Sequence, residues 1–173
     1  MKVLAFAASS SRNSINKQLA NFTASQIPEA QVELLDINDY EMPLFSEDRE
    51  KELGHPTLAK AFYQKLGEAD IIVIAFAEHN GSYTAAYKNL FDWTSRIDMK
   101  VFQNKPVIML AASPGPGGAT SVLASAQGSA PFFAADLKGA ISVPNFYDNF
   151  DLENGQVTNK TLLEELQKVI AKL

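Results

Sequence analysis

The sequence contains no cysteine at all, and only two of its 173 residues are histidines. Without cysteine there are no disulfides, no thiolate metal ligands and no thiol nucleophiles. His55 and His79 are too few for a metal site built from imidazoles alone, so we expect no bound metal. If the protein is an enzyme, its chemistry has to come from other side chains or from a cofactor.

Long apolar runs and basic runs are also missing. The first apolar run, Val3–Ala8, is far shorter than the roughly 20 residues that span a bilayer, and no charged leader or cleavage site accompanies it. We therefore expect a cytoplasmic protein without a membrane partner. The formal net charge is −5 and lysine and arginine form no cluster, which argues against nucleic-acid binding.

Five short apolar runs suggest buried strands. Each run is too short for a helix, and none alternates cleanly with polar residues, which is typical of strands buried on both faces. The runs are Val3–Ala8, Val32–Ile37, Ile71–Phe76, Val107–Ala112 and Ala140–Val143.

Between and after these runs lie stretches with helical spacing of apolar residues. A further helix over 119–133 is interrupted by Gly128 and Pro131. The apolar stripes are Ile15/Leu19/Phe22, Leu58/Phe62/Leu66, Tyr87/Leu90/Phe91/Thr94 and Leu162/Leu163/Leu166/Val169/Ile170/Leu173.

Strand and helix alternate five times, which predicts an α/β domain with a parallel sheet covered by helices on both faces. The length fits one domain, residues 1–173. The polar stretch Asn38–Pro56 is long for a connection, and we expect a surface loop there. Ligands of such sheets bind beyond the carboxyl ends of the strands, where the loops Ser9–Asn16, Ala77–Thr84 and Ser113–Ala119 meet.

The first of these loops joins a buried strand to a helix and is rich in serine. Unpaired amides and the positive dipole end at a helix start attract anions, and Ser9, Ser11 and Ser14 add hydroxyls. The guanidinium of Arg12 adds a positive charge and paired N–H donors, which suit a phosphate monoester. The alternative is a plain helix cap, since serine and asparagine are preferred there.

The other two loops are rich in turn residues. Asn80-Gly81 indicates either a simple turn or a backbone platform that a flat ring can approach. The stretch Ser113–Gly118 holds three glycines and two prolines. It is either a rigid connection or a second segment of shaped backbone with little side-chain bulk, which a ligand can approach. Three such loops at one sheet end favour a ligand site.

Ser9–Leu19, Glu78–Trp93 and Ser113–Gly118 resemble the three motifs of the NADPH-dependent FMN reductase family, which includes azoreductases, quinone reductases and chromate reductases. The family typically has Pro-Glu-Tyr-Asn in the second motif, where this chain has Ala77 and His79 in place of the proline and the tyrosine. A glycine is usual where Ala8 stands. The resemblance implies a flavodoxin-like three-layer sandwich with strand order 2-1-3-4-5.

The resemblance also implies that FMN is the cofactor, that NADPH or NADH is the electron donor and that the flavin itself carries the hydride, so we assign no catalytic acid, base or nucleophile. His79 and Tyr83 are the candidates for the substrate face. The cofactor-binding candidates are Ser9, Ser11, Arg12, Ser14, Ile15 and Asn16 for the phosphate, and Glu78, His79, Asn80, Gly81, Ser113, Gly115, Gly117 and Gly118 for the ring.

The expected function is therefore an NAD(P)H-dependent oxidoreductase that reduces a quinone, an azo compound, free flavin or a metal oxyanion by ping-pong hydride transfer. Three alternatives stay open: a flavodoxin-like electron carrier or flavin-binding protein without reductase activity of its own, a receiver-type regulatory domain, and a flavin-free binding or scaffolding protein. A receiver needs acidic residues after the first strand, where Ala8 and Ser9 stand. Tyr87, Phe91 and Trp93 offer more apolar surface than one core contact needs, which with the resemblance predicts a homodimer or homotetramer.

Overall fold

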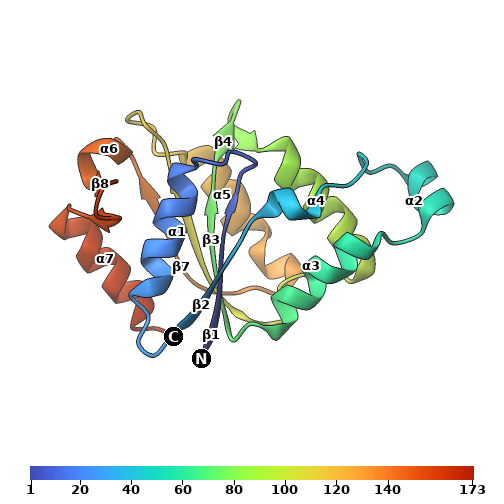
Figure 1. Ribbon diagram of the computed structural model, residues 1–173, viewed down its shortest axis with the longest axis horizontal. Helices are drawn as coiled ribbons and strands as arrows, with labels where there is room; N and C mark the ends of the chain where they lie inside the picture. The colour runs from blue at the N-terminus through green and yellow to red at the C-terminus, as the bar shows by residue number, and fades with distance from the viewer.

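A five-stranded parallel sheet forms the centre of the structure, a computed structural model that describes residues 1–173 (Figure 1). Its strands lie in the spatial order β2-β1-β3-β6-β7. Numbered among the sheet strands alone, this is the order 2-1-3-4-5, so the predicted flavodoxin-like topology is confirmed. The strands are β1 (Lys2–Ala8), β2 (Gln31–Leu35), β3 (Ile71–Phe76), β6 (Pro106–Ala112) and β7 (Asp136–Val143).

Helices cover both faces of this sheet and complete three layers (Figure 1). Successive side chains of a strand point to opposite faces, so Leu4 and Phe6 pack into one core and Val3 and Ala5 into the other. This double burial explains why the central strands are apolar throughout. The first core is closed by α3 (Thr57–Glu68), α4 (Ala85–Ile97) and α5 (Thr120–Ser129), and the second by α1 (Ile15–Ser25) and α7 (Lys160–Ile170).

The two edge strands differ from the expectation of burial on both faces. β2 ends at Leu35, its Leu34 is 40% exposed, and Ile37 begins the 3₁₀ helix η1 (Ile37–Tyr40). β7 begins earlier than predicted, at Asp136, and most of its side chains are only half-buried. An edge strand has a neighbour on one side only, and the flanking helices cover it incompletely.

The stretch predicted as a surface loop between Asn38 and Pro56 contains the rest of η1 and a helix, α2 (Glu47–Leu53), so that prediction was wrong. The Ser46 hydroxyl accepts a hydrogen bond from the Arg49 amide and caps α2. No residue of α2 is buried, and the helix projects from the body of the molecule (Figure 1).

The segment before α2 is fastened to α4. Trp93 Nε1 donates to the Pro43 carbonyl at 2.7 Å, and the Asn89 side chain bonds the backbone of Pro43 and Phe45. The Phe45 and Trp93 rings meet edge to face at 5.0 Å. Trp93 is fully buried, and the groups that its ring contacts here lie in the same chain.

The interrupted helix predicted over 119–133 is α5 followed by the 3₁₀ helix η2 (Ala130–Phe133). Gly128 is accommodated within α5, whereas Pro131 lies in η2, where the tighter turn begins. The short elements are the antiparallel pairs β4 (Glu78–His79) with β5 (Ser82–Tyr83) and β8 (Phe150–Asp151) with β9 (Gln156–Val157), and α6 (Phe146–Asn149). None of the helices has the length and apolar character needed to cross a membrane.

Candidate active site

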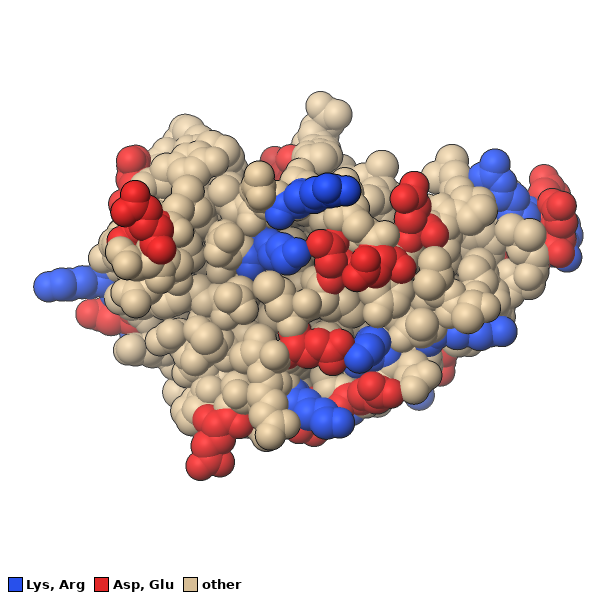
Figure 2. All heavy atoms as spheres, in the orientation of Figure 1, with Lys and Arg blue, Asp and Glu red and all other residues tan.

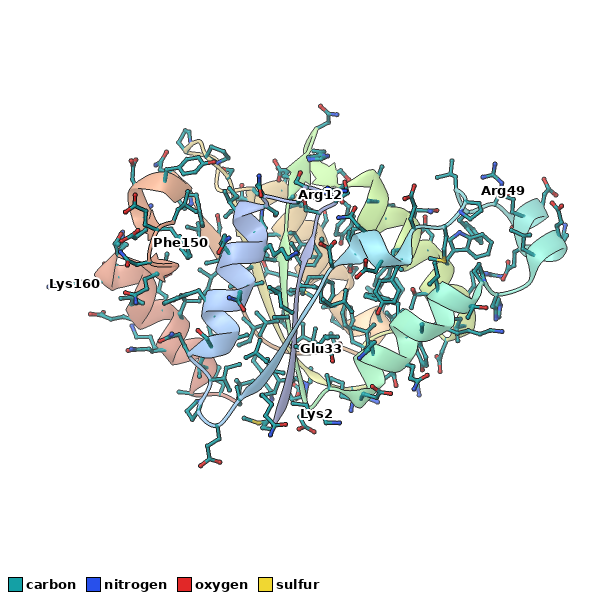
Figure 3. All side chains as sticks on the ribbon, in the orientation of Figure 1. Lys2, Arg12, Glu33, Arg49, Phe150 and Lys160 are labelled. Carbon is teal, nitrogen blue, oxygen red and sulfur yellow. The ribbon has the colours of Figure 1, made fainter.

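The three predicted loops leave the sheet side by side. Ala8 at the end of β1 pairs with Phe76 at the end of β3, and Phe76 pairs with Ala111 near the end of β6. Figure 3 shows Arg12 at this edge of the sheet, at the opposite end of the molecule from Lys2. The topological expectation that all three loops meet at the carboxyl end is confirmed.

In the first loop, Ser14 is the N-cap of α1, and its hydroxyl accepts a hydrogen bond from the Lys17 amide at 3.3 Å. The next two amides, of Ile15 and Asn16, belong to the first helical turn, where the helix itself offers no acceptor. The helix-cap interpretation is therefore confirmed, and the cap leaves the amides of Ile15 and Asn16 without a helical acceptor.

The remaining side chains of this loop include two that are exposed and engaged with nothing else. Ser11 and Arg12 are exposed, and neither side chain makes a hydrogen bond or ion pair within the protein. Ser9 is buried, and its hydroxyl accepts from the Ser11 amide at 3.2 Å, which shapes the turn. A free guanidinium beside free helix amides fits a phosphate monoester.

The side chain of Asn16 is engaged within the protein. Its side chain is 2% exposed, and the amide group is used at both ends: Nδ2 donates to the Ala112 carbonyl at 3.2 Å and Oδ1 accepts from the Ala112 amide at 2.9 Å. The side chain thus ties α1 to the end of β6 and leaves only the Asn16 backbone amide for a phosphate.

The second loop is a two-residue hairpin between β4 and β5. Asn80 and Gly81 at its tip have φ angles of 52° and 75°, the positive values that this tight turn demands. His79, Asn80 and Gly81 are exposed, and a Cβ added to Gly81 would meet no atom within 4 Å. The residues therefore form a turn, as one interpretation predicted, and also leave open backbone for a flat ring.

The base of the hairpin is tied to its surroundings by two side chains. Glu78 Oε2 accepts a hydrogen bond from the Val122 amide in α5 at 2.8 Å. Thr84 is 1% exposed; its hydroxyl donates to the Ala8 carbonyl at 3.0 Å and accepts from the Tyr87 amide at 3.2 Å. Sequence reasoning missed Thr84, although a threonine directly before an apolar helical stripe is an N-cap signal.

The third loop is packed against the end of β7. Ser113 Oγ donates to the Gly115 carbonyl at 2.9 Å, and Ser142 Oγ donates to the Gly118 carbonyl at 2.7 Å. Gly118 is buried with a φ of 59°, and a Cβ there would collide with Ser142. Gly118 thus serves the approach to β7, which differs from the predicted approach to a ring. Gly115 and Gly117 face open space and keep that role available.

An aromatic groove of about 250 Å³ continues from this edge between α4 and α5. The ring of Tyr83 lies 5.8 Å from that of Phe76 and 5.5 Å from that of Tyr87. Burial raises the pKa of Tyr87 well above its ordinary value, so its phenol stays neutral and able to donate. The predicted substrate-face residue Tyr83 is therefore half-buried at the groove, whereas His79 stands exposed on the hairpin.

Charges around the site are mixed. Figure 2 shows lysine and arginine side chains next to aspartate and glutamate on the face viewed there, without a continuous basic patch. Lys17 pairs with Asp36 at 2.9 Å beside the first loop. Nowhere do three or more histidine, aspartate or glutamate side chains gather closely enough to hold a metal ion.

Solved structures resemble this fold over nearly its whole length. An NAD(P)H:acceptor oxidoreductase from Paracoccus denitrificans, FerB, superimposes with a TM-score of 0.74, 21% identity and coverage of 98% of this chain and 93% of the other. An azoreductase from Bacillus anthracis superimposes with a TM-score of 0.66, 19% identity and full coverage of both chains. These similarities support the fold.

Sequence relatives are closer. A 2-hydroxy-1,4-benzoquinone reductase of a Burkholderia species is 29% identical over 99% of this chain and 93% of its own length. An NADPH:quinone oxidoreductase of Arabidopsis thaliana is 37% identical over 58% of this chain, and the match spans half of the plant protein.

The sequence profile of one family, described as NADPH-dependent FMN reductase, matches residues 1–148. This match confirms the resemblance found in the three motifs, and with it the predicted oxidoreductase class, the FMN cofactor and the nicotinamide donor. The chain belongs to the NADPH-dependent FMN reductase family.

Proposed function

We propose that this protein uses FMN to pass reducing equivalents from NADPH or NADH to a small quinone. The observation that carries the proposal is the division of the sheet edge into a free anion-binding loop and two loops of open backbone. Relatives named as quinone reductases support the choice of acceptor. The test is oxidation of NADPH or NADH by the purified, flavin-loaded protein with quinones, azo dyes, free flavin and chromate offered separately.

The phosphate of FMN would be held by the Arg12 guanidinium, the Ser9, Ser11 and Ser14 hydroxyls and the first amides of α1, from Ile15 and Asn16. These groups have the right charge, and Arg12 has no competing partner within the protein. An absorption spectrum with the bands of oxidised flavin, restored by adding FMN to stripped protein, would support the assignment. Protein that binds FMN no better than riboflavin would contradict a phosphate site.

The ring of FMN would lie between the hairpin and the third loop, against the backbone of His79, Asn80 and Gly81 on one side and of Gly115 and Gly117 on the other. These positions carry little bulk or stand open, so close approach costs no displacement of side chains. Bound FMN supplies the hydride chemistry, and the residues of this chain bind and orient it. No residue of the chain needs to act as acid, base or nucleophile.

We further propose that donor and acceptor bind in turn at one open face, which gives ping-pong kinetics. The edge carries one set of converging loops, and the chain has no second glycine-rich strand-to-helix turn for a separately held dinucleotide. Parallel lines in double-reciprocal plots are expected. Intersecting lines with a stable ternary complex would contradict the single face, and protein that holds FMN but oxidises neither nucleotide would be an electron carrier.

His79 and Tyr83 border that face in this proposal. His79 is exposed on the hairpin, and Tyr83 lies at the mouth of the groove between α4 and α5. Replacing His79 by alanine or tyrosine should change the ratio of kcat/KM between two quinones more than the affinity for FMN. Equal changes in both quantities would instead place His79 among the flavin contacts.

A homodimer is also proposed, with paired dimers as an extension. The original support from Trp93 falls away, because the segment 42–45 covers that ring within the chain. The support now comes from Phe132, which is 77% exposed, and from the neighbouring groove that Phe91 and Phe133 line. Light scattering at micromolar concentration should give twice the chain mass, and Phe132→Ser should weaken the assembly. We also propose a cytoplasmic location for the protein.

A further inference from the structure

We propose that Glu78 is a positioning residue that locks the third loop at a fixed distance from the hairpin by capping α5 with its carboxylate. The inference deepens the proposed function, because these two loops are the proposed walls of the flavin slot. It assigns the Glu78 side chain to the protein's own backbone and leaves the ring contacts of the hairpin to backbone groups.

The need for an external cap is visible at the start of α5. Ala119 is the N-cap residue, has a φ of 54° and offers no side-chain oxygen. The first turn contains no acidic residue. Only some of its backbone amides have acceptors in the backbone. The Thr120 amide donates to the Gly117 carbonyl at 3.3 Å, and the Leu123 amide donates to the Ala119 carbonyl at 3.3 Å. The Val122 amide would have no acceptor without Glu78.

Glu78, which lies 44 positions before Val122 in the sequence, supplies the missing acceptor. Its Oε2 accepts from the Val122 amide at 2.8 Å, and Val122 is fully buried. A buried amide without an acceptor is costly, and a carboxylate at a helix N-terminus is favoured by the helix dipole. The contact is therefore a firm connection between β4 and α5.

The connection differs from the other ties at this edge. Asn16 joins α1 to β6, and Thr84 joins α4 to β1, so both link a helix to the end of a sheet strand. The bond from Val122 to Glu78 is the one that joins the hairpin directly to the helix following the third loop. Loss of this bond would free the start of α5 and the glycine-bearing loop before it, and the proposed slot would lose its fixed width.

Two conservative variants separate this role from a direct action of charge on the flavin. Glu78→Gln keeps the length and an acceptor oxygen but loses the charge. Glu78→Asp keeps the charge but is one methylene too short to reach Val122. Glu78→Ala removes both, and Glu164→Ala removes an exposed glutamate on α7 as a matched control.

The first measurement uses the flavin-free protein. Amide hydrogen exchange at Val122 should be about tenfold faster in Glu78→Ala and Glu78→Asp, and within about threefold of the parent in Glu78→Gln and Glu164→Ala. Unchanged exchange at Val122 in Glu78→Ala would overturn the cap. This measurement needs no bound FMN. A failure of the cap is therefore distinguishable from a failure of the proposed function.

The second measurement uses FMN itself. The dissociation constant should rise about tenfold in Glu78→Ala and Glu78→Asp, while Glu78→Gln keeps the parent affinity, visible spectrum and midpoint potential. A Gln variant with a shifted potential beside an Asp variant like the parent would show that the charge acts on the flavin directly, and would overturn the positioning role. Far-ultraviolet circular dichroism confirms that each variant is folded.

Discussion

The first loop and the two glycine-bearing loops stand at the same edge of the sheet, yet they differ in how they use their charged side chains. Ser11 and Arg12 in the first loop are exposed and bond to nothing else in the protein through their side chains. In the other loops Glu78 and Ser113 are bonded to backbone groups, and Gly118 is packed against β7. The first loop therefore leaves its guanidinium free, whereas the carboxylate of the hairpin is used to hold the backbone of α5 in place.

This difference suits a ligand with a charged end and a flat end. A phosphate is best held by donors that are free to bind, whereas a ring needs backbone whose spacing is set before the ligand arrives. The comparison predicts that substitutions divide into two classes, those that weaken the fold and those that weaken binding alone.

The largest expected effect is on stability, from Asn16→Ala. The variant leaves the buried amide and carbonyl of Ala112 without partners, which should lower the free energy of unfolding by about 2–4 kcal/mol. Urea denaturation of the flavin-free protein measures it, with the exposed Asn13→Ala in the same loop as control. If Asn13→Ala costs as much as Asn16→Ala, the tie to Ala112 contributes nothing particular.

Arg12→Ala should weaken FMN binding without lowering the stability of the protein. We expect FMN affinity to fall by about 1.5–3 kcal/mol, since a charge-assisted contact is lost, while the free energy of unfolding without flavin stays unchanged. Flavin fluorescence titration measures the affinity, and Lys51→Ala on the projecting α2 is the matched control. Equal affinity in the Arg12 and Lys51 variants would remove Arg12 from the phosphate site.

Ser14→Ala tests the boundary between the two classes, because Ser14 caps α1 and lies beside the proposed phosphate site. It should cost about 1 kcal/mol of stability as a lost N-cap and weaken FMN binding as well. Parallel urea and fluorescence titrations separate the two effects. A loss of stability with unchanged FMN affinity would assign Ser14 to capping alone.

A glycine pair sharpens the comparison within the third loop. Gly118→Ala should destabilise the protein by about 1–2 kcal/mol, because its φ of 59° and the contact with Ser142 both disfavour a Cβ. Gly117→Ala, one position away and in open space, should leave the thermal midpoint nearly unchanged and instead lower FMN affinity. Equal stability of the two variants would contradict a structural role for Gly118.

The smallest effect concerns Asp36 beside the first loop. A hydrogen bond from the Asn38 amide, and then Lys17, lower the pKa of Asp36, so its stabilisation is present near neutral pH and is lost as the pH falls through the lowered pKa. Asp36→Asn should cost about 0.5–1 kcal/mol at pH 7 and nothing once the parent carboxyl is protonated. Urea titrations at pH 7 and at a pH below the lowered pKa of Asp36 measure this cost, with Asp39→Asn at an exposed position as control. A cost independent of pH would mean that charge plays no part.

Much of the fold was readable from local pattern. The apolar runs Val3–Ala8 and Ile71–Phe76 predicted central strands because a strand buried on both faces has no polar positions. The same reasoning was wrong for the stretch between Asn38 and Pro56, where α2 forms. Ser46 followed by acidic residues was a helix start signal there, but α2 buries nothing and so shows no apolar stripe.

The sequence predicted that the three loops meet, but it did not predict the hydrogen bonds that two of the candidate site residues make within the protein. Asn16 and Glu78 were assigned to FMN by their motif positions, and in the structure their side chains serve Ala112 and Val122 instead. No local signal reveals this, because the partners are backbone groups 96 and 44 positions away. A polar residue in a binding motif looks the same whether it faces the ligand or holds the loop that does.

The sequence by itself determined the alternation of strand and helix, the three loops at one sheet edge and the family motifs, because these depend on residue type and short-range spacing. Only the tertiary structure decided which side chains are free. Arg12 is available because its side chain is exposed and makes no hydrogen bond or ion pair within the protein, whereas Glu78 is engaged because α5 starts at a residue that cannot cap its own helix. Hydrogen-bonding demand at the end of one element is met by whatever the fold brings beside it, and that neighbour is a property of three-dimensional packing.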